Sequence, residues 1–351
     1  MADFEQGKEL LRVEHLCQYF GRTKAVDDVS FSIYKGEVFG LVGESGCGKT
    51  TTGRSIIKIY DITSGDIYLN GKRVAAGVMS YKLAIKEAKK RLKEAATDEE
   101  RAALKDEIAH NKAEIVKAKK VQQKEKVVDR IQMIFQDPIA SLDPRMTVKE
   151  IISEGLIIQG VKDKKEIEER VYEALEKVGL VREHTGRYPH EFSGGQRQRI
   201  GIARSVIMHP EMIIADEPVS ALDVSIQAQV INLLNDLRKE YGITIMFIAH
   251  DLSVVKYFSD RIGVMYYGKM VELASSDELF AHPMHPYTRS LLSAIPLPDP
   301  DSEKKRKRLV YNKLKDHDYS VQGPTMREIV PGHFVYCNDE EEARYKKEFN
   351  L

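Results

Sequence analysis

The residues most able to do chemistry begin with the run GESGCGKTT at positions 43–51. Glycines at this spacing let consecutive backbone N–H groups point inward at phosphate oxygens, beside a helix start whose partial positive charge favours anions. Lys49 would reach the β- and γ-phosphates, and the Thr50 hydroxyl would hold Mg²⁺. We therefore predict a nucleotide site formed by Gly43, Glu44, Ser45, Gly46, Cys47, Gly48, Lys49, Thr50 and Thr51. The motif alone would equally suit a kinase, a GTPase, a helicase or a transport motor.

A pair of acidic residues supplies the carboxylate that a nucleotide-bound metal ion needs. The apolar run 212–215 ends in Asp216 and Glu217, which predicts that both lie at the carboxyl edge of a sheet, beside the phosphate loop. Asp216 would hold Mg²⁺ through water, and Glu217 could polarise the attacking water molecule. A strand that merely ends in a solvated Asp-Glu pair is common, so the pair is informative only together with the phosphate loop.

A second phosphate-binding pattern occurs in FSGGQRQRIGIARS at positions 192–205. A Ser-Gly-Gly-Gln turn that opens a helix presents backbone N–H groups and a hydroxyl at a positively polarised helix end. One active site has no evident use for two such elements. Two subunits that sandwich a nucleotide do, because the phosphate loop of one then faces the turn of the other. We therefore expect four residues of this turn to contact a nucleotide that a second subunit holds: Ser193, Gly194, Gly195 and Gln196.

The chain resembles the ATP-binding-cassette ATPases, whose signature is LSGGQ; here Phe192 stands in the leucine position. The resemblance implies ATP and Mg²⁺ as ligands and ATP hydrolysis as the activity. Gln136 in IFQDP matches a glutamine that contacts Mg²⁺ and the attacking water and links the site to a membrane partner. Asp223, which ends the run SALD at 220–223, matches a loop that crosses the dimer interface.

Two ring-bearing residues take their expected roles from the same resemblance. His250, which closes the apolar run 243–250, matches the histidine that senses the γ-phosphate, although a histidine closing a buried strand is more often structural. Phe20 matches the aromatic residue that stacks on adenine, with Tyr19 as the alternative, and either ring could belong to the core. The expected catalytic set is Glu217, His250 and Gln136, and the expected metal set is Thr50, Gln136 and Asp216.

The sequence beyond the cassette-like part narrows the class. Residues 282–300, HPMHPYTRSLLSAIPLPDP, closely resemble the segment that follows the cassette in oligopeptide and dipeptide import ATPases, and residues 136–152 are similar to the same subfamily. The resemblance implies an importer with a second ATPase subunit, two membrane permease subunits and an extracytoplasmic peptide-binding protein. It places this chain with the second ATPase type, at the cytoplasmic face of the membrane. The residues of 282–300 do not themselves indicate peptide, because a Pro-rich connector with a short helix fits them equally.

The elements that must position these residues follow from periodicity. Short strands are predicted within 11–42, and an Asn-Gly turn predicts a hairpin within 64–74. Strands at 211–216 and 243–250, with an amphipathic helix at 225–242 between them, predict a largely parallel, helix-covered sheet. A strand, a glycine-rich turn and a helix starting near the lysine form the context that a phosphate loop requires.

The expected fold class is therefore α/β. In the terms of the resemblance it is a P-loop NTPase cassette with a RecA-like core, an antiparallel β subdomain and a helical signature subdomain. Residues 1–275 would form the nucleotide-binding domain, and residues 276–351 a small C-terminal extension.

The stretch 81–127 has a different composition, rich in Lys, Glu, Ala, Gln and Arg and without Pro or Gly. Apolar residues three to four positions apart predict two helices, and residues 97–100 (TDEE) read as a capping box that starts the second. We expect an antiparallel helical hairpin that projects from the globular body, with a charged and partly disordered insertion as the alternative. Its apolar seam would contain Leu83, Ala84, Ala88 and Leu92 on one helix and Leu104, Ile108, Ile115 and Ala118 on the other.

Composition sets further limits. Lys+Arg and Asp+Glu both number 54, so no net charge draws the chain to nucleic acid or anionic lipid. The apolar runs are far shorter than the about 20 residues of a membrane helix, and the charged start is unlike a secretory signal, which favours the cytoplasm. The 3 cysteines are widely spaced, which argues against a disulfide framework, and Cys337 alone near the C-terminus makes an iron–sulfur cluster unexpected.

A different class of protein stays open: a non-transport ATPase of the same superfamily that acts on nucleic acid or the ribosome through the helical insertion. The insertion's tip, ATDEE, lacks the cysteines of a zinc hook, and its lysines alternate with acids and lack aromatic neighbours. A solvated helical face is therefore favoured, and no nucleic-acid partner is expected. An inactive regulatory subunit is disfavoured because Lys49, Asp216, Glu217 and His250 are all present.

Overall fold

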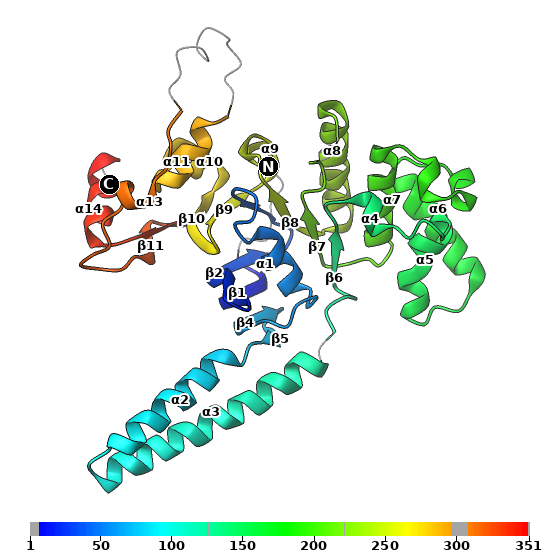
Figure 1. Cartoon of the computed structure of the whole chain (residues 1–351). Helices are drawn as coiled ribbons and strands as arrows, with labels where there is room; N and C mark the ends of the chain where they lie inside the picture. Colours follow the sequence, from blue (N-terminus) through cyan, green and yellow to red (C-terminus); the bar gives the residue numbers. More distant parts are fainter. Residues whose placement is uncertain (1–6, 125, 221, 296–307, 350–351) are drawn as a thin grey trace.

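The structure is a computed structural model that describes residues 7–124, 126–220, 222–295 and 308–349. Two sheets and a set of helices form the body, and one pair of helices projects from it (Figure 1). Within the described residues, no helix is both long enough and apolar enough to cross a membrane.

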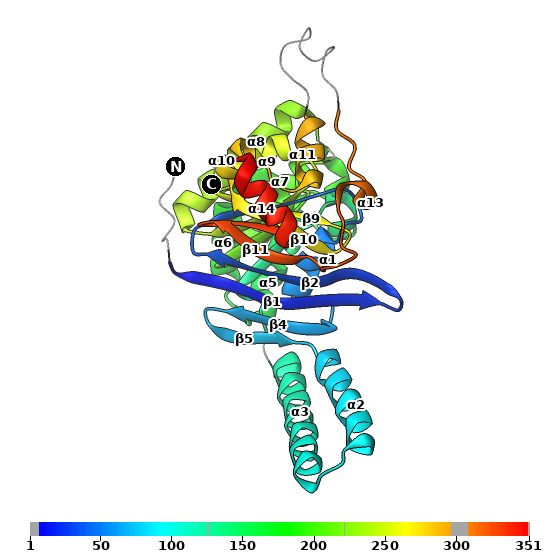
Figure 2. The ribbon, with the colours of Figure 1, turned by 90° about the vertical axis from the view of Figure 1, so that its left-hand side faces the viewer.

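The smaller sheet is antiparallel, with the strand order β2-β1-β4-β5. Its strands are β1 (Glu9–Phe20), β2 (Thr23–Tyr34), β4 (Ser64–Leu69) and β5 (Lys72–Ala76). The predicted Asn-Gly hairpin turn is confirmed: Asn70 and Gly71, with φ of 48° and 73°, both adopt the left-handed backbone that a tight hairpin needs. Figure 2 shows this sheet as a layer between the larger sheet and the projecting helices.

The larger sheet has the strand order β11-β12-β10-β9-β3-β8-β7-β6. The strands from β6 to β9 are mutually parallel, and the three at the β11 end are antiparallel. Every residue of β3, β7 and β8 is buried, which explains why their sequences are continuous apolar runs. The bounds are β3 (Val38–Val42), β6 (Ile131–Ile134), β7 (Met212–Asp216), β8 (Thr244–Ala249), β9 (Arg261–Tyr266), β10 (Lys269–Ser275), β11 (Thr325–Val330) and β12 (His333–Cys337).

Helices cover one face of the larger sheet, and α5, α6 and α7 form a separate group beyond β6 and β7 (Figure 1). The longer helices are α1 (Lys49–Ile56), α5 (Val148–Ile158), α6 (Lys164–Lys177), α7 (Gly194–Val206), α8 (Val224–Tyr241), α9 (Leu252–Phe258), α11 (Pro286–Ser293) and α14 (Asp339–Glu348). The short ones are α4 (Pro138–Ser141), α10 (Ser276–Ala281), α13 (Lys313–Asp316) and the 3₁₀ turns Arg182–Gly186 and Pro189–Glu191.

Two hydrophobic cores lie on the two faces of the larger sheet, and β3 contributes to both. Val38 and Val42 belong to the core under the helices, whereas Phe39 and Leu41 belong to the core shared with the smaller sheet. Because side chains alternate along a strand, one buried strand holds both layers together. The loop that follows β3 therefore starts from a rigidly held point.

The projecting pair consists of α2 (Met79–Glu94) and α3 (Asp98–Lys124), as predicted for this insertion (Figures 1 and 2). Its buried seam contains Ala88, Leu104 and Ile108, with Ile85, Leu92 and Ala95 packed against them. The prediction for Leu83 is wrong, because its side chain is 57% exposed. Positions 85, 88 and 92 are about one or two turns apart on one helix face, and position 83 points roughly 200° away from position 85.

The described residues after 276 pack onto the rest of the chain and do not form a detached appendage. β12 pairs with β10, with Leu273 opposite Phe334, so the C-terminal strands extend the large sheet. A small core of Met284, Ile329, Val335, Cys337 and Tyr345 joins α14 to these strands. The proposed division at residue 275 stays a prediction.

Candidate active site

The phosphate loop connects β3 to α1, as its sequence context predicted. Gly43 and Gly48 have φ of 148° and 108°, a region that side chains rarely adopt. A Cβ on Gly43 would lie 2.2 Å from the carbonyl oxygen of Met265, and one on Gly48 would lie 2.3 Å from that of Ala25. Both glycines are therefore required by close backbone contact as well as by conformation.

Lys49 starts α1 and is buried. Its Nζ donates to the carbonyl oxygens of Gly43 at 2.7 Å and Glu44 at 3.0 Å, and it lies 4.0 Å from Oε1 of Glu217. The first-turn N–H groups of a helix have no partner within the helix, and the first turn of α1 begins where this loop ends. A buried ammonium beside a polarised helix start is an arrangement suited to phosphate oxygens.

Cys47 occupies the loop as a small buried residue. Burial raises the pKa of its thiol, while Lys49 at 3.8 Å from Sγ opposes that shift only in part. A thiol that stays protonated is a poor nucleophile, so Cys47 serves the loop as a small buried residue and not as a reactive group.

Asp216 lies at the end of β7, fully buried beside the loop. The Thr50 hydroxyl donates to Oδ1 of Asp216 at 2.8 Å, while Oδ2 is buried without a hydrogen-bond partner among the described residues. Burial raises the pKa of this carboxyl, and the Thr50 hydrogen bond partly counteracts it. An unpartnered carboxylate oxygen next to a hydroxyl is an oxygen donor set of the kind that Mg²⁺ prefers, so these residues fit the predicted metal.

Glu217 contacts the other two predicted catalytic residues, Gln136 and His250. Its Oε2 accepts a hydrogen bond from Gln136 Nε2 at 3.0 Å and lies 3.2 Å from His250 Nδ1. The three residues follow β6, β7 and β8, which are adjacent parallel strands, so their carboxyl ends meet at one edge. Glu217 has a φ of 45°, an uncommon conformation for a residue other than glycine and one that clusters at functional sites.

The Ser-Gly-Gly-Gln turn lies at the start of α7, and not beside the phosphate loop. Ser193 caps α7, its Oγ accepts from the N–H of Gln196, and the Gln196 side chain accepts from the N–H of Ser193. Ser193 and Gly194 are exposed, and Gly195 is half-buried. Figure 1 shows α7 separated from α1 by β7 and β8. One chain therefore does not bring its two predicted phosphate-binding elements together.

The remaining predicted residues lie at the surface. Phe20 ends β1 with 45% of its surface exposed and meets Tyr60 edge-on at 5.2 Å. The Tyr19 hydroxyl already donates to Asp27 at 2.5 Å, so Phe20 has the freer ring for stacking. Asp223 is exposed at the N-cap position of α8, and its side chain makes no capping hydrogen bond there.

One side chain that touches the phosphate loop was not predicted. The N–H of Glu44 donates to the hydroxyl oxygen of Tyr287 at 3.0 Å, and Tyr287 belongs to α11 of the C-terminal segment. Tyr287 stands inside the run HPMHPYTRS that marked the subfamily resemblance, but no local pattern in that run pointed to the loop.

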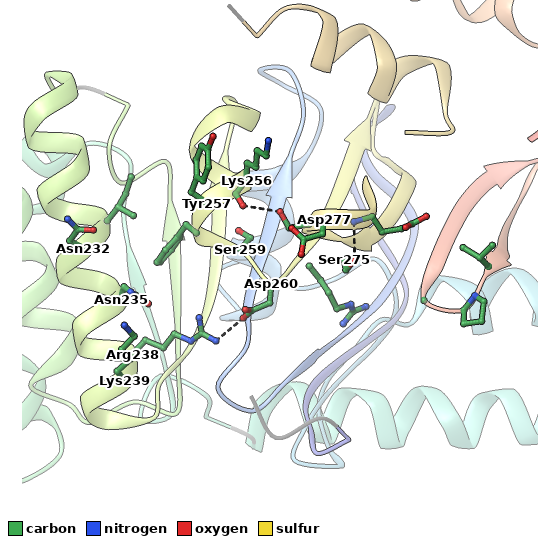
Figure 3. A pocket seen from close by; sticks show the side chains of 18 residues that line it. Asn232, Asn235, Arg238, Lys239, Lys256, Tyr257, Ser259, Asp260, Ser275 and Asp277 are labelled. Carbon is green, nitrogen blue, oxygen red and sulfur yellow. Dashed lines mark hydrogen bonds and ion pairs between the residues drawn. The ribbon is translucent and has the colours of Figure 1, made fainter. Parts of the chain in front are cut away.

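A large hollow of about 1050 Å³ is separate from all of these residues. It lies between α8, α9 and α10, with Asn232, Tyr257 and Lys256 among its lining residues (Figure 3). Arg238 at its wall donates to Asp260 at 2.8 Å and to the carbonyl oxygen of Gly36 at 2.7 Å, which joins α8 to the sheet. None of the predicted nucleotide-binding residues lines it.

Comparison with known proteins identifies the family of the chain. The ABC transporter family matches residues 26–220, and the family described as the oligopeptide/dipeptide transporter C-terminal region matches residues 271–319. The chain is 54% identical to the oligopeptide transport ATP-binding protein OppF of Bacillus subtilis, over 95% of this chain and 98% of the relative. It is 49% identical to the dipeptide transport ATP-binding protein DppF of Lactococcus lactis, over 94% of this chain and 93% of the relative.

Solved structures agree on the fold. A dimeric, post-hydrolysis structure of an ATP-binding cassette bound to ADP and Pi aligns with a TM-score of 0.56 at 24% identity, over 76% of this chain and 99% of that one. The α/β cassette architecture that the sequence predicted is thereby confirmed.

Proposed function

The chain belongs to the ATP-binding-cassette transporter family, and from that premise we propose that it is the ATP-hydrolysing motor subunit of a membrane importer for oligopeptides or dipeptides. The observation that carries the hydrolytic part is the contact of Glu217 with both Gln136 and His250, beside Lys49. The peptide part is supported by the names of the relatives and by the matching C-terminal family.

ATP would lie across the phosphate loop, with its phosphates at the start of α1 and its adenine on Phe20. Thr50, Asp216 and Gln136 would hold Mg²⁺, which supplies positive charge to the phosphate oxygens when it is bound. The unpartnered Oδ2 of Asp216 supports this assignment. Gln136 donates to Glu217 through Nε2, so its amide oxygen would be the atom that contacts Mg²⁺.

Glu217 would orient the attacking water and accept its proton. The hydrogen bond from Gln136 and the contact with His250 fix the carboxylate of Glu217, so that a water bound to it has a defined position. His250 is 55% exposed at its side chain, which leaves its other ring nitrogen able to meet a γ-phosphate.

The signature turn would serve a second subunit. Ser193 and Gly194 are exposed at the start of α7, which β7 and β8 separate from α1 in Figure 1. We therefore infer that two cassettes close head-to-tail around two ATP molecules. Asp223 would lie at that interface. The solved structure of a cassette bound to ADP and Pi is dimeric, which supports pairing of two cassettes. The partner would be a second ABC ATPase subunit, of the same or a different kind.

The assembly would act at the cytoplasmic face of the membrane, on two permease subunits, with an extracytoplasmic peptide-binding protein as an indirect partner. Closure would pull on the permeases through the region around Gln136, and hydrolysis would reopen the motor. The described side chains of α2 and α3 offer no feature that favours a role on nucleic acid or the ribosome, and the OppF and DppF relatives are transport proteins. Co-purification with hydrophobic membrane subunits, against co-purification with ribosomes or DNA, separates the two functions.

The deciding experiment is Glu217→Gln in the assembled transporter. Losing the carboxylate should lower ATP turnover by about 10²–10⁴-fold while a closed, ATP-bound dimer accumulates. Glu211→Gln is the matched control, because Glu211 directly precedes β7, at the end opposite to Glu217, and pairs with Arg130. The ATP turnover of this variant should equal that of the unmodified protein. ATP turnover at the normal rate in Glu217→Gln would refute the assignment of Glu217 as the general base. Unimpaired ATP binding by Lys49→Ala would refute the phosphate-loop assignment.

A further inference from the structure

Tyr287 connects the C-terminal segment directly to the phosphate loop. Its side chain is 2% exposed, and its hydroxyl oxygen accepts the N–H of Glu44 at 3.0 Å. The two residues are 243 positions apart, so the contact exists only because β9 lies next to β3 and brings α11 beside the loop.

The contact has a specific geometry, because one peptide unit contains both the carbonyl of Gly43 and the N–H of Glu44. Lys49 donates to that carbonyl at 2.7 Å, and Tyr287 accepts from that N–H at 3.0 Å. A single peptide plane is therefore held from both of its ends. Glycine at 43, with a φ of 148°, gives the plane no side chain to hinder rotation.

Tyr287 itself is fixed from several directions. Its ring packs against Tyr266 at 4.4 Å and Tyr311 at 5.5 Å between centroids, and its N–H donates to Nδ1 of His285 at 3.1 Å. Just before it, the buried carboxylate of Glu272 accepts the N–H groups of residues 284 and 285 at 2.7 and 3.1 Å. The phenol thus has little freedom to follow the loop if the loop moves.

We propose that Tyr287 is a positioning residue for nucleotide binding, through which the C-terminal segment sets the nucleotide affinity of the phosphate loop. This inference rests on the proposed function. When phosphates draw the Lys49 ammonium away, the Gly43 carbonyl loses its partner, and the hydrogen bond to Tyr287 is the contact that still holds the peptide plane within the part of the chain that the structure describes. Without the hydroxyl, the plane rotates in part of the molecules, and the fraction competent to bind nucleotide falls.

The test compares Tyr287→Phe with Tyr311→Phe in the full chain. Tyr311 belongs to the same aromatic cluster, but none of the hydrogen bonds found among the described residues involves its hydroxyl. Titration with ADP and Mg²⁺ by isothermal calorimetry should give a dissociation constant raised roughly three- to tenfold for Tyr287→Phe, the range of one hydrogen bond. Tyr311→Phe should bind like the unmodified chain. In the assembled transporter, Tyr287→Phe should raise KM for ATP by a similar factor, with kcat within about twofold.

A second measurement examines the loop without nucleotide. Amide hydrogen exchange of the peptide that contains residues 43–49 should be faster in Tyr287→Phe than in Tyr311→Phe, because the Glu44 N–H has lost its acceptor. Removing one oxygen leaves the ring packing intact, so the thermal unfolding midpoint should change little in either variant.

The outcomes separate the two proposals. If the unmodified chain binds no ADP or ATP, the proposed function fails. If the unmodified chain binds nucleotide and Tyr287→Phe binds it equally well with unchanged loop exchange, the positioning role is overturned while the function stands. An equal loss of affinity in both variants would also overturn it, because ring packing and not the hydroxyl would then be responsible.

Discussion

The strongest structural requirement in the phosphate loop is the absence of a side chain at Gly43. In Gly43→Ala the new Cβ would lie 2.2 Å from the carbonyl oxygen of Met265 and 2.7 Å from Sγ of Cys47. Gly46 is a matched comparison in the same loop, because it also has a positive φ, of 80°, but a Cβ added there would have no neighbouring atom within 4 Å among the described residues. The pair therefore separates steric overlap from backbone conformation.

The two substitutions should lower the free energy of unfolding by different amounts. An L-residue held in the backbone conformation of Gly43 costs about 1–3 kcal/mol, and overlap with neighbours that cannot retreat adds about 1–3 kcal/mol. Gly43→Ala should thus lower the free energy of unfolding by about 2–6 kcal/mol, a large part of the about 5–15 kcal/mol of a typical protein. Gly46→Ala has only the conformational cost, about 1–2 kcal/mol.

Thermal unfolding followed by circular dichroism, without nucleotide, measures the difference. At about 2 °C per kcal/mol for a large chain, Gly43→Ala should melt roughly 4–12 °C below the unmodified protein and Gly46→Ala roughly 2–4 °C below it. Gly43→Ala should also fail to bind ADP, since the peptide that receives Lys49 is displaced. Equal melting temperatures for the two variants would show that overlap with the Met265 carbonyl does not determine the need for glycine at position 43.

Three further changes give sharp outcomes. Phe20→Ala should weaken ATP binding roughly tenfold by loss of stacking, while Phe20→Tyr retains affinity; calorimetry with both variants checks the adenine assignment. Leu104→Ala should cost about 2 kcal/mol in the hairpin and speed its amide exchange, whereas Leu83→Ala, at an exposed position, should change little. Burial alone would lower the pKa of His333, but its bonds to Glu272 and Glu278 outweigh burial and raise it. Its charged form therefore stabilises the fold fully below about pH 6.5 and less as pH rises through the raised pKa, so His333→Gln should lower the melting temperature more at pH 6 than at pH 9.

Much of the site followed from sequence because its geometry is local or set by parallel pairing. A buried apolar run, a glycine turn and a helix beginning at Lys49 are consecutive in the chain, and all three are found as predicted. Asp216 and Glu217 were expected beside that loop because parallel strands present their carboxyl ends at one edge. The contact of Glu217 with His250 depends on β8 lying next to β7, which residue types alone do not determine.

The parts that were missed depend on long-range packing. Tyr287 reaches Glu44 only through the order of strands in the large sheet, and the pairing of β12 with β10 has no local signature. Leu83 was misassigned because apolar spacing of three to four fits more than one helix face, and only contact with α3 decides which face is buried. In each case the deciding fact is which element lies next to which.

The separation of the two predicted phosphate-binding elements would have a mechanical consequence. If one chain brought its signature turn to its own phosphate loop, it could complete the site around ATP and hydrolyse it without moving relative to anything else. In this chain the groups proposed to orient water, Glu217, Gln136 and His250, contact one another beside the loop, but Ser193 caps α7. Figure 1 shows α7 beyond β7. Under the proposed function, the missing half of the site arrives only when a second cassette closes. Hydrolysis is then tied to a movement between subunits, which is the movement that a transport motor must deliver to its membrane partners.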